Sequence, residues 1–87
     1  FVTGEIMGPK NTVIYTKQNC PFCTKIKQLY KMKGWSYNEL VLDVNFTRDQ
    51  IFEEFGRGCT FPQLIVDGKK TGGCNETINE FRRNGWV

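Results

Sequence analysis

The pattern of apolar and polar positions predicts four short strands. Residues 12–16 (Thr-Val-Ile-Tyr-Thr) are rich in β-branched and aromatic residues, and residues 63–67 are largely apolar. Both patterns are typical of buried strands. A third segment alternates, placing Leu40, Leu42 and Val44 on one face. Asp67-Gly68 is a strong signal for a hairpin turn between two strands. The predicted strands cover residues 12–16, 37–44, 63–67 and 69–71.

Local signals at both ends define a first helix from Pro21 to about Lys33. Proline is favoured at the first helical position because the amide proton it lacks would have no partner there. Gly34 is a natural stop, and lysines in the last turn suit the negative end of the helix dipole. The inner face of this helix carries Cys23, Ile26, Leu29 and Tyr30, and its outer face carries Lys25, Lys27, Lys31 and Lys33.

A capping box marks the start of a second helix. Thr47 and Gln50 can satisfy each other's backbone amides, and Gly56 ends the helix. After two glycines, Asn75 can cap a third helix. The inward-facing positions of these two helices are Ile51, Phe52, Phe55, Ile78 and Phe81.

The predicted order of elements is therefore β-α-β-α-β-β-α, which indicates a single α/β domain over residues 12–87. We expect residues 1–11 to form a mobile extension, with a short helical turn near residues 5–7. The 87 residues are 39% apolar and 24% charged, which is typical of a soluble globular protein rather than a disordered or fibrous one. Leu64-Ile65-Val66 is far too short to cross a membrane, and we expect no signal peptide at the start of the chain.

Charge is unevenly spread along the chain. The net charge is +3, and residues 1–38 contain six lysines and one acidic residue. Most of these lysines fall on one helix without interleaved aromatic residues, which favours a solvated helix face over a nucleic-acid surface.

The pair Cys20-Pro21-Phe22-Cys23 carries the candidate chemistry. It places the first sulfur at a helix N-cap, where unpaired amides and the dipole stabilise a thiolate, and Lys17 adds a cation nearby. The pKa of such cysteines runs from roughly 3.5 to 7.5, against about 8.5 for a free thiol. We assign Cys20 as the nucleophile and Cys23 as the resolving thiol.

Two other uses of these cysteines remain open. A zinc site would need Cys59 and Cys74 as further ligands, because the chain contains no histidine, and a second Cys-x-x-Cys is missing. A purely structural disulfide is the other alternative. Four cysteines are few for a disulfide-stapled scaffold, which favours a reducing compartment.

Two further segments contain turn-forming residues. Pro62, at the head of a strand in Thr60-Phe61-Pro62, could form a cis bond that turns the backbone of residue 61 toward a peptide-like substrate. The second segment, residues 72–76, places a glycine bend before a helix N-terminus, which readily binds a carboxylate.

Taken together, Lys17, Cys20-Pro-Phe-Cys23, Thr60-Phe-Pro62 and Gly72-Gly73 resemble the dithiol glutaredoxins over residues 11–85. The resemblance implies a thioredoxin fold, with a four-stranded mixed sheet flanked by helices. It implies that glutathione is a co-substrate and that no cofactor or metal is bound. It also implies a glutathione site with three parts, in which Lys17 binds the glycine carboxylate. The cysteinyl part would contact Phe22, Thr60, Phe61 and a cis Pro62. The γ-glutamyl end would contact Gly73, Cys74, Asn75 and Glu76. Gln63 and Arg57 are additional candidates for the carboxylate.

The chain departs from the family pattern at three positions. Family members typically have valine in place of Phe61 and often aspartate in place of Glu76. Cys59 is unusual, and it is either a bystander core thiol or a third redox-sensitive site. Cys74 has precedent in the family and is expected to pack passively.

The resemblance predicts a monomeric, cytoplasmic, glutathione-dependent thiol–disulfide oxidoreductase, or an organellar one if a targeting peptide precedes this sequence. Its substrates would be protein–glutathione mixed disulfides and protein disulfides. We expect it to bind neither nucleic acid nor a membrane. One alternative is a glutaredoxin-like thioredoxin recycled by thioredoxin reductase. Another is a carrier in which two Cys20 thiolates and two glutathiones hold a [2Fe–2S] cluster, which Pro21 disfavours by family analogy.

Overall fold

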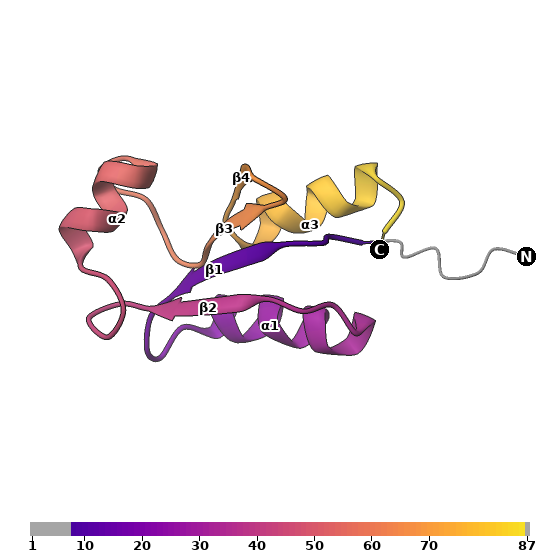
Figure 1. Cartoon of the computed structure of the whole chain (residues 1–87), viewed down its shortest axis with the longest axis horizontal. Coiled ribbons are helices and arrows are strands. Elements are labelled where there is room, and N and C mark those ends of the chain that lie inside the picture. Colours follow the sequence, from indigo (N-terminus) through magenta and orange to yellow (C-terminus); the bar gives the residue numbers. More distant parts are fainter. Residues whose placement is uncertain (1–7, 87) are drawn as a thin grey trace, which may run out of the picture.

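A computed structural model describes residues 8–86, in which a four-stranded sheet is combined with three helices (Figure 1). The predicted order of elements is confirmed. The elements are β1 (Thr12–Thr16), α1 (Pro21–Lys33), β2 (Asn38–Val41), α2 (Arg48–Phe55), β3 (Gln63–Val66), β4 (Lys69–Gly72) and α3 (Cys74–Arg83). The expected helical turn near residues 5–7 lies outside the described residues.

The sheet is mixed, with strand order β2-β1-β3-β4. β1 pairs in parallel with β2 and antiparallel with β3, and β3 and β4 form the hairpin that Asp67-Gly68 predicted. The parallel pair requires a crossover, which α1 provides. β1 is therefore an inner strand, and the loop that follows it leads directly from the centre of the sheet into α1.

The two faces of the sheet carry two separate apolar clusters. The first joins the sheet to α1 and α3, and its members are Ile14, Ile26, Tyr30, Trp35, Leu64, Val66, Cys74 and Phe81. The second consists of Leu42, Phe46 and Ile51, with Tyr15, Leu40, Phe52, Phe55, Cys59 and Phe61 packed against it. Successive residues of β1, Ile14 and Tyr15, belong to different clusters, as the alternation of a strand requires. α2 lies at one end of the molecule, away from α1 and α3 (Figure 1).

Tyr30 lies at the centre of the first cluster. Its ring packs against Trp35, Tyr37 and Phe81, and its hydroxyl is hydrogen-bonded to Thr12 Oγ1 at 2.9 Å. Burial raises the pKa of Tyr30 to about 12, because a phenolate would lose its hydration there.

We expect the free energy of unfolding to fall between about pH 10 and pH 12. The unfolded chain loses the Tyr30 proton near pH 10, whereas the folded chain holds it until about pH 12, so rising pH favours unfolding within this window only. The loss should be about 3 kcal/mol in all, since each of the two pKa units corresponds to about 1.4 kcal/mol. Urea unfolding at several pH values measures it, with Tyr30→Phe as the control, because phenylalanine has no proton to lose. An equal decline in both proteins would contradict this prediction.

The second strand is shorter than predicted. It ends at Val41, whose amide donates to Asn45 Oδ1 at 3.0 Å, and the chain then turns through Asp43, which has a φ of 66°. The expectation that Val44 shares a buried face with Leu40 and Leu42 is wrong, because Val44 is 68% exposed. The side chain of Asn45, four residues further along the chain, caps the end of the strand. The pattern of apolar residues does not indicate this contact.

The third helix begins earlier than predicted. Its N-cap is Gly73, and the first helical hydrogen bond runs from the amide of Thr77 to the Gly73 carbonyl at 2.9 Å. The prediction of Asn75 as N-cap is therefore wrong, since Asn75 lies inside the first turn. The helix is instead anchored by a hydrogen bond of 2.8 Å between the hydroxyls of Thr77 and Thr71 on β4.

The described part of the expected extension packs on the domain. Gly8 and Pro9 are buried, and the amides of Lys10 and Asn11 donate to Asp67 Oδ1 at 2.9 and 2.7 Å. Residues 8–11 thus lie against the β3–β4 turn. The expectation of a mobile segment remains a prediction for residues 1–7, which lie outside the described range.

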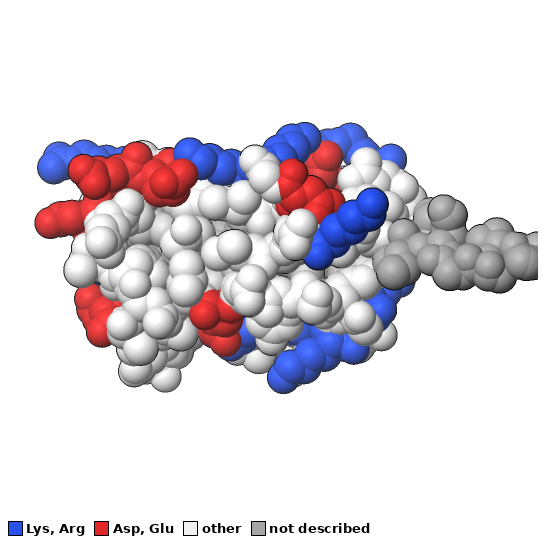
Figure 2. Space-filling view, viewed as in Figure 1, with Lys and Arg blue, Asp and Glu red and all other residues white. Residues whose placement is uncertain are grey.

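Charged side chains lie mainly at the margins of the face shown in Figure 2, where acidic and basic residues are neighbours, and the middle of that face is uncharged. This face therefore lacks the continuous basic patch typical of a nucleic-acid surface. None of the helices in residues 8–86 is both long and apolar enough to span a membrane.

Candidate active site

Cys20 is the N-cap of α1, as the sequence predicted. Its backbone is extended, and its Sγ accepts a hydrogen bond from the amide of Cys23 at 3.1 Å. Pro21 occupies the first helical position, where its missing amide proton costs nothing. The sulfur of Cys20 therefore takes the place of the hydroxyl or carboxylate oxygen that usually caps a helix.

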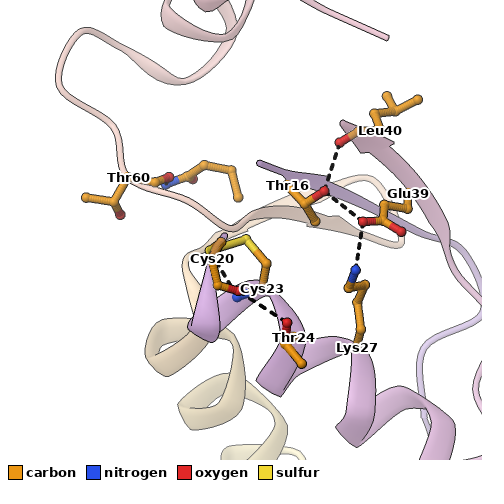
Figure 3. Close-up of a disulfide and its surroundings, with 9 residues drawn as sticks. Thr16, Cys20, Cys23, Thr24, Lys27, Glu39, Leu40 and Thr60 are labelled. Carbon is orange, nitrogen blue, oxygen red and sulfur yellow. Dashed lines mark hydrogen bonds and ion pairs between the residues drawn. A yellow bond between two sulfur atoms is a disulfide. The ribbon is translucent and has the colours of Figure 1, made fainter. Parts of the chain in front are cut away.

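Cys20 and Cys23 are joined by a disulfide, with their Cα atoms 5.2 Å apart (Figure 3). The two residues differ in accessibility, since Cys20 is 8% exposed and Cys23 only 1%. An incoming disulfide can therefore reach Cys20 more readily. This geometry supports Cys20 as the attacking thiol and Cys23 as the resolving one.

A groove of about 250 Å³ brings together eight of the predicted site residues. Three separate segments line it: the start of α1, the loop before β3 and the start of α3. The peptide bond between Phe61 and Pro62 is cis, as predicted. The residues that line this groove, called the cis-proline groove below, are Phe22, Thr60, Phe61, Pro62, Gly73, Cys74, Asn75 and Glu76.

Gly73 allows α3 to approach the cis-proline segment. A Cβ at this position would lie 3.0 Å from Glu76 Oε1 and 3.4 Å from the carbonyl oxygen of Pro62. The first contact involves the flexible end of the Glu76 side chain, and the second is at the limit of ordinary van der Waals contact. Gly73 therefore leaves room for the Glu76 carboxylate at the start of α3.

Lys17 does not line the cis-proline groove, but it lies beside Phe61 and lines a second groove that borders both cysteines. Its ammonium is 5.9 Å from the centroid of the Phe61 ring, within the range of a cation–π contact. The Phe61 ring in turn stacks on Phe46, with centroids 6.1 Å apart. The aromatic side chain that replaces the usual valine thus connects the lysine to the second apolar cluster.

Gln63 and Arg57 have other surroundings. The Gln63 amide is buried and donates to the carbonyl of Thr60 at 2.7 Å, so it holds the loop before Pro62 in place. Arg57 lines a separate hollow beside α2, together with Asp49, Gln50, Phe52 and Glu53. The structure does not bring either side chain to the cis-proline groove.

The other two cysteines are not joined to the disulfide. Cys74 is buried, and burial raises the pKa of its thiol, so it is a poor nucleophile. Cys59 is half-buried and packs against the second cluster. Within residues 8–86 the four cysteines do not gather into a metal-binding group, so no observation favours the zinc alternative.

One part of the site was missed by the sequence analysis. A larger groove of about 610 Å³ borders both Cys20 and Cys23, and its lining includes Thr16, Lys27 and Glu39. Glu39 Oε2 accepts a hydrogen bond from Thr16 Oγ1 at 2.8 Å and pairs with Lys27 Nζ at 2.9 Å. The Lys27 ammonium, by donating to this carboxylate, lowers the pKa of Glu39, so the pair is ionised at neutral pH. Only the four-residue spacing of Cys23 and Lys27 is visible in the sequence.

The chain is similar in sequence and in structure to known glutaredoxins. The glutaredoxin family model matches residues 12–70. Glutaredoxin 3 of Escherichia coli strain K12 is 40% identical over 76 residues, which cover 86% of this chain and 90% of that protein. The crystal structure of a buckwheat glutaredoxin–glutathione complex aligns with a TM-score of 0.74 at 25% identity, covering 87% of this chain and 72% of the other. The holo form of glutaredoxin C1 from Populus tremula x tremuloides aligns with a TM-score of 0.69 at 30% identity, covering 84% of this chain and 75% of the other.

The family match therefore spans the dithiol, the parallel strand pair and the cis-proline segment, which together make up most of the site. Cys20 and Cys23 form the redox-active pair of a thiol–disulfide oxidoreductase with a thioredoxin fold, and the chain belongs to the glutaredoxin family.

Proposed function

We propose that the protein reduces protein–glutathione mixed disulfides and protein disulfides at the expense of glutathione. The observation that carries this proposal is the cis-proline groove, which joins Phe22, the residue just before Cys23, to the N-terminus of α3. Glutathione is an extended tripeptide with a carboxylate at each end. The Lys17 ammonium beside Phe61 and the helix N-terminus of α3 offer one positive group to each carboxylate.

In the proposed complex, the Lys17 ammonium binds the glycine carboxylate and the backbone of Phe61 pairs with the cysteinyl residue. The first turn of α3, with Asn75 and Glu76, binds the γ-glutamyl end, where the helix N-terminus attracts the carboxylate and Glu76 attracts the amine. Phe22, Thr60, Pro62, Gly73 and Cys74 complete the lining of the groove. The glutathione sulfur then lies next to Cys20.

Deglutathionylation needs Cys20 alone. Its thiolate attacks the glutathione sulfur of the mixed disulfide, a new disulfide forms between Cys20 and glutathione, and the protein thiolate leaves and takes up a proton. A second glutathione thiolate then attacks the bound glutathione sulfur. Oxidised glutathione leaves, and the Cys20 thiolate is restored.

Reduction of a protein disulfide needs both cysteines. Cys20 attacks one sulfur of the substrate and releases the other as a thiolate, and the Cys23 thiolate then attacks Cys20 Sγ. The protein leaves as a dithiol and the Cys20–Cys23 disulfide remains, which is the form described above. Two glutathiones reduce this disulfide and complete the cycle without a bound cofactor.

The source of electrons distinguishes this function from that of a thioredoxin. A glutathionylated peptide would be supplied in parallel with glutathione and glutathione reductase, or with thioredoxin reductase alone. We expect rapid turnover only with glutathione. Turnover only with thioredoxin reductase would leave the Cys20–Cys23 chemistry intact and would contradict the glutathione site.

Replacing Lys17 with methionine should raise KM for the glutathionylated peptide by roughly three- to tenfold, with a smaller fall in kcat. The loss corresponds to one charge-assisted hydrogen bond at an exposed site. Steady-state kinetics measure it. Lys33→Met is the matched control, because Lys33 is an exposed lysine in the last turn of α1. An equal effect of both substitutions would contradict a specific role for Lys17.

A further inference from the structure

The larger groove beside the dithiol contains one ion pair, formed by Lys27 and Glu39. Both cysteines border this groove, and Thr16 lies between them and the carboxylate (Figure 3). The side chains of Lys27 and Glu39 are only 27% and 30% exposed, so water screens them incompletely. Their charges can therefore act on the sulfurs across the groove.

Two elements position this pair next to the dithiol. Lys27 follows Cys23 by four residues on α1, one helical turn further along. The expectation that Lys27 lies on the outer face is wrong, because its side chain is only 27% exposed and reaches Glu39 on β2. Glu39 comes from β2, where the parallel register pairs it with Ile14, two residues before Thr16. The hydroxyl of Thr16 fixes the carboxylate from β1, so both charges are held by regular secondary structure.

Charged groups from three elements and one loop surround the dithiol. The N-terminus of α1 and the ammonium groups of Lys17 and Lys27 are positive, and Glu39 is the negative side chain in the larger groove. On α3, Glu76 is the acidic side chain that lines the cis-proline groove. Because Lys27 and Glu39 are in contact at 2.9 Å, their fields at the sulfurs largely cancel.

We infer that Glu39 neutralises Lys27, a lysine that would otherwise stabilise the Cys20 thiolate, so that the loss of either charge alone changes how readily the dithiol is oxidised. Both residues are positioning residues, because neither is required to touch the substrate. The inference rests on the thiol–disulfide chemistry of Cys20 and Cys23, and it does not depend on glutathione as the substrate.

The two single substitutions should act in opposite directions. Glu39→Gln leaves the Lys27 ammonium unopposed, so the thiolate should form at lower pH and the reduced dithiol should become more stable. Lys27→Met leaves the Glu39 carboxylate unopposed and should have the reverse effect. Each should move the thiolate titration midpoint by roughly half a pH unit and the dithiol–disulfide equilibrium constant by about threefold. The double variant should return close to the original protein.

Two measurements test this inference. Thiolate absorbance in the ultraviolet is followed against pH in the reduced protein, and the disulfide equilibrium is measured against reduced and oxidised dithiothreitol. Neither measurement uses glutathione, so a failure of the proposed substrate would not affect them. Urea unfolding of each variant reports separately on the structural contribution of the pair.

Glu80→Gln is the matched control. Glu80 pairs with Lys69 and Arg83 at the other end of α3, so its loss removes comparable ion pairs away from the dithiol. It should leave both redox measurements unchanged. If Glu39→Gln and Lys27→Met shift the equilibrium in the same direction, or leave it unchanged, the pair only ties α1 to β2 and the inference is overturned.

Discussion

Turnover of disulfide substrates should fall by at least roughly a thousandfold when Cys20 is replaced with serine. A serine hydroxyl is not ionised at neutral pH and cannot form the mixed disulfide through which both proposed reactions pass. Cys20 is also the more accessible of the two cysteines, so Cys23 cannot easily replace it. Release of glutathione from a glutathionylated peptide measures the loss.

Cys23→Ser provides the matched comparison. It should retain deglutathionylation and lose reduction of protein disulfides, because only the latter needs a second internal thiol. Full activity of Cys20→Ser would refute the assignment of the nucleophile. Equal loss in both variants would show that Cys23 takes part in the first step.

Phe81→Ala should lower the free energy of unfolding by about 3–5 kcal/mol, the usual range for removing a buried phenylalanine ring. Phe81 is fully buried, and its ring packs against Tyr30, Trp35 and Trp86 between α3 and the sheet. Domains of this size are marginally stable, so the loss would be a large part of the total. Urea unfolding measures it.

Phe22→Ala is the control for this prediction. The Phe22 side chain is 53% exposed, so its removal should change the free energy of unfolding by at most about 0.5 kcal/mol. A similar loss for Phe81→Ala and Phe22→Ala would mean that the cluster around Tyr30 contributes little to stability.

Local sequence signals predicted those elements whose ends are determined locally. Pro21 and Gly34 mark the two ends of α1, and the reciprocal hydrogen bonds of Thr47 and Gln50 begin α2 as predicted. The errors fall where a side-chain contact that the apolar pattern does not reveal decides the end of an element. Asn45 accepts from the last amide of β2 through its side chain, and the hydrogen bond between Thr77 and Thr71 on β4 anchors the first turn of α3.

The site, too, has a part that could be predicted from the sequence and a part that could not. The residues of the cis-proline groove follow from the family resemblance, and the structure places all eight in one hollow. The pair of Lys27 and Glu39 could not be predicted, because it depends on the parallel register of β1 and β2. Nothing in the spacing of Lys27 and Glu39 along the chain indicates that they meet.

The sulfur of Cys20 has two roles, since it closes the disulfide and caps α1. This ties the redox chemistry of the protein to its conformational stability through a closed thermodynamic cycle. The difference in folding free energy between the oxidised and reduced chains must equal the difference in disulfide formation free energy between the folded and unfolded chains. Any substitution that strengthens the cap in the reduced form alone will, to the same extent, make the folded protein a stronger oxidant.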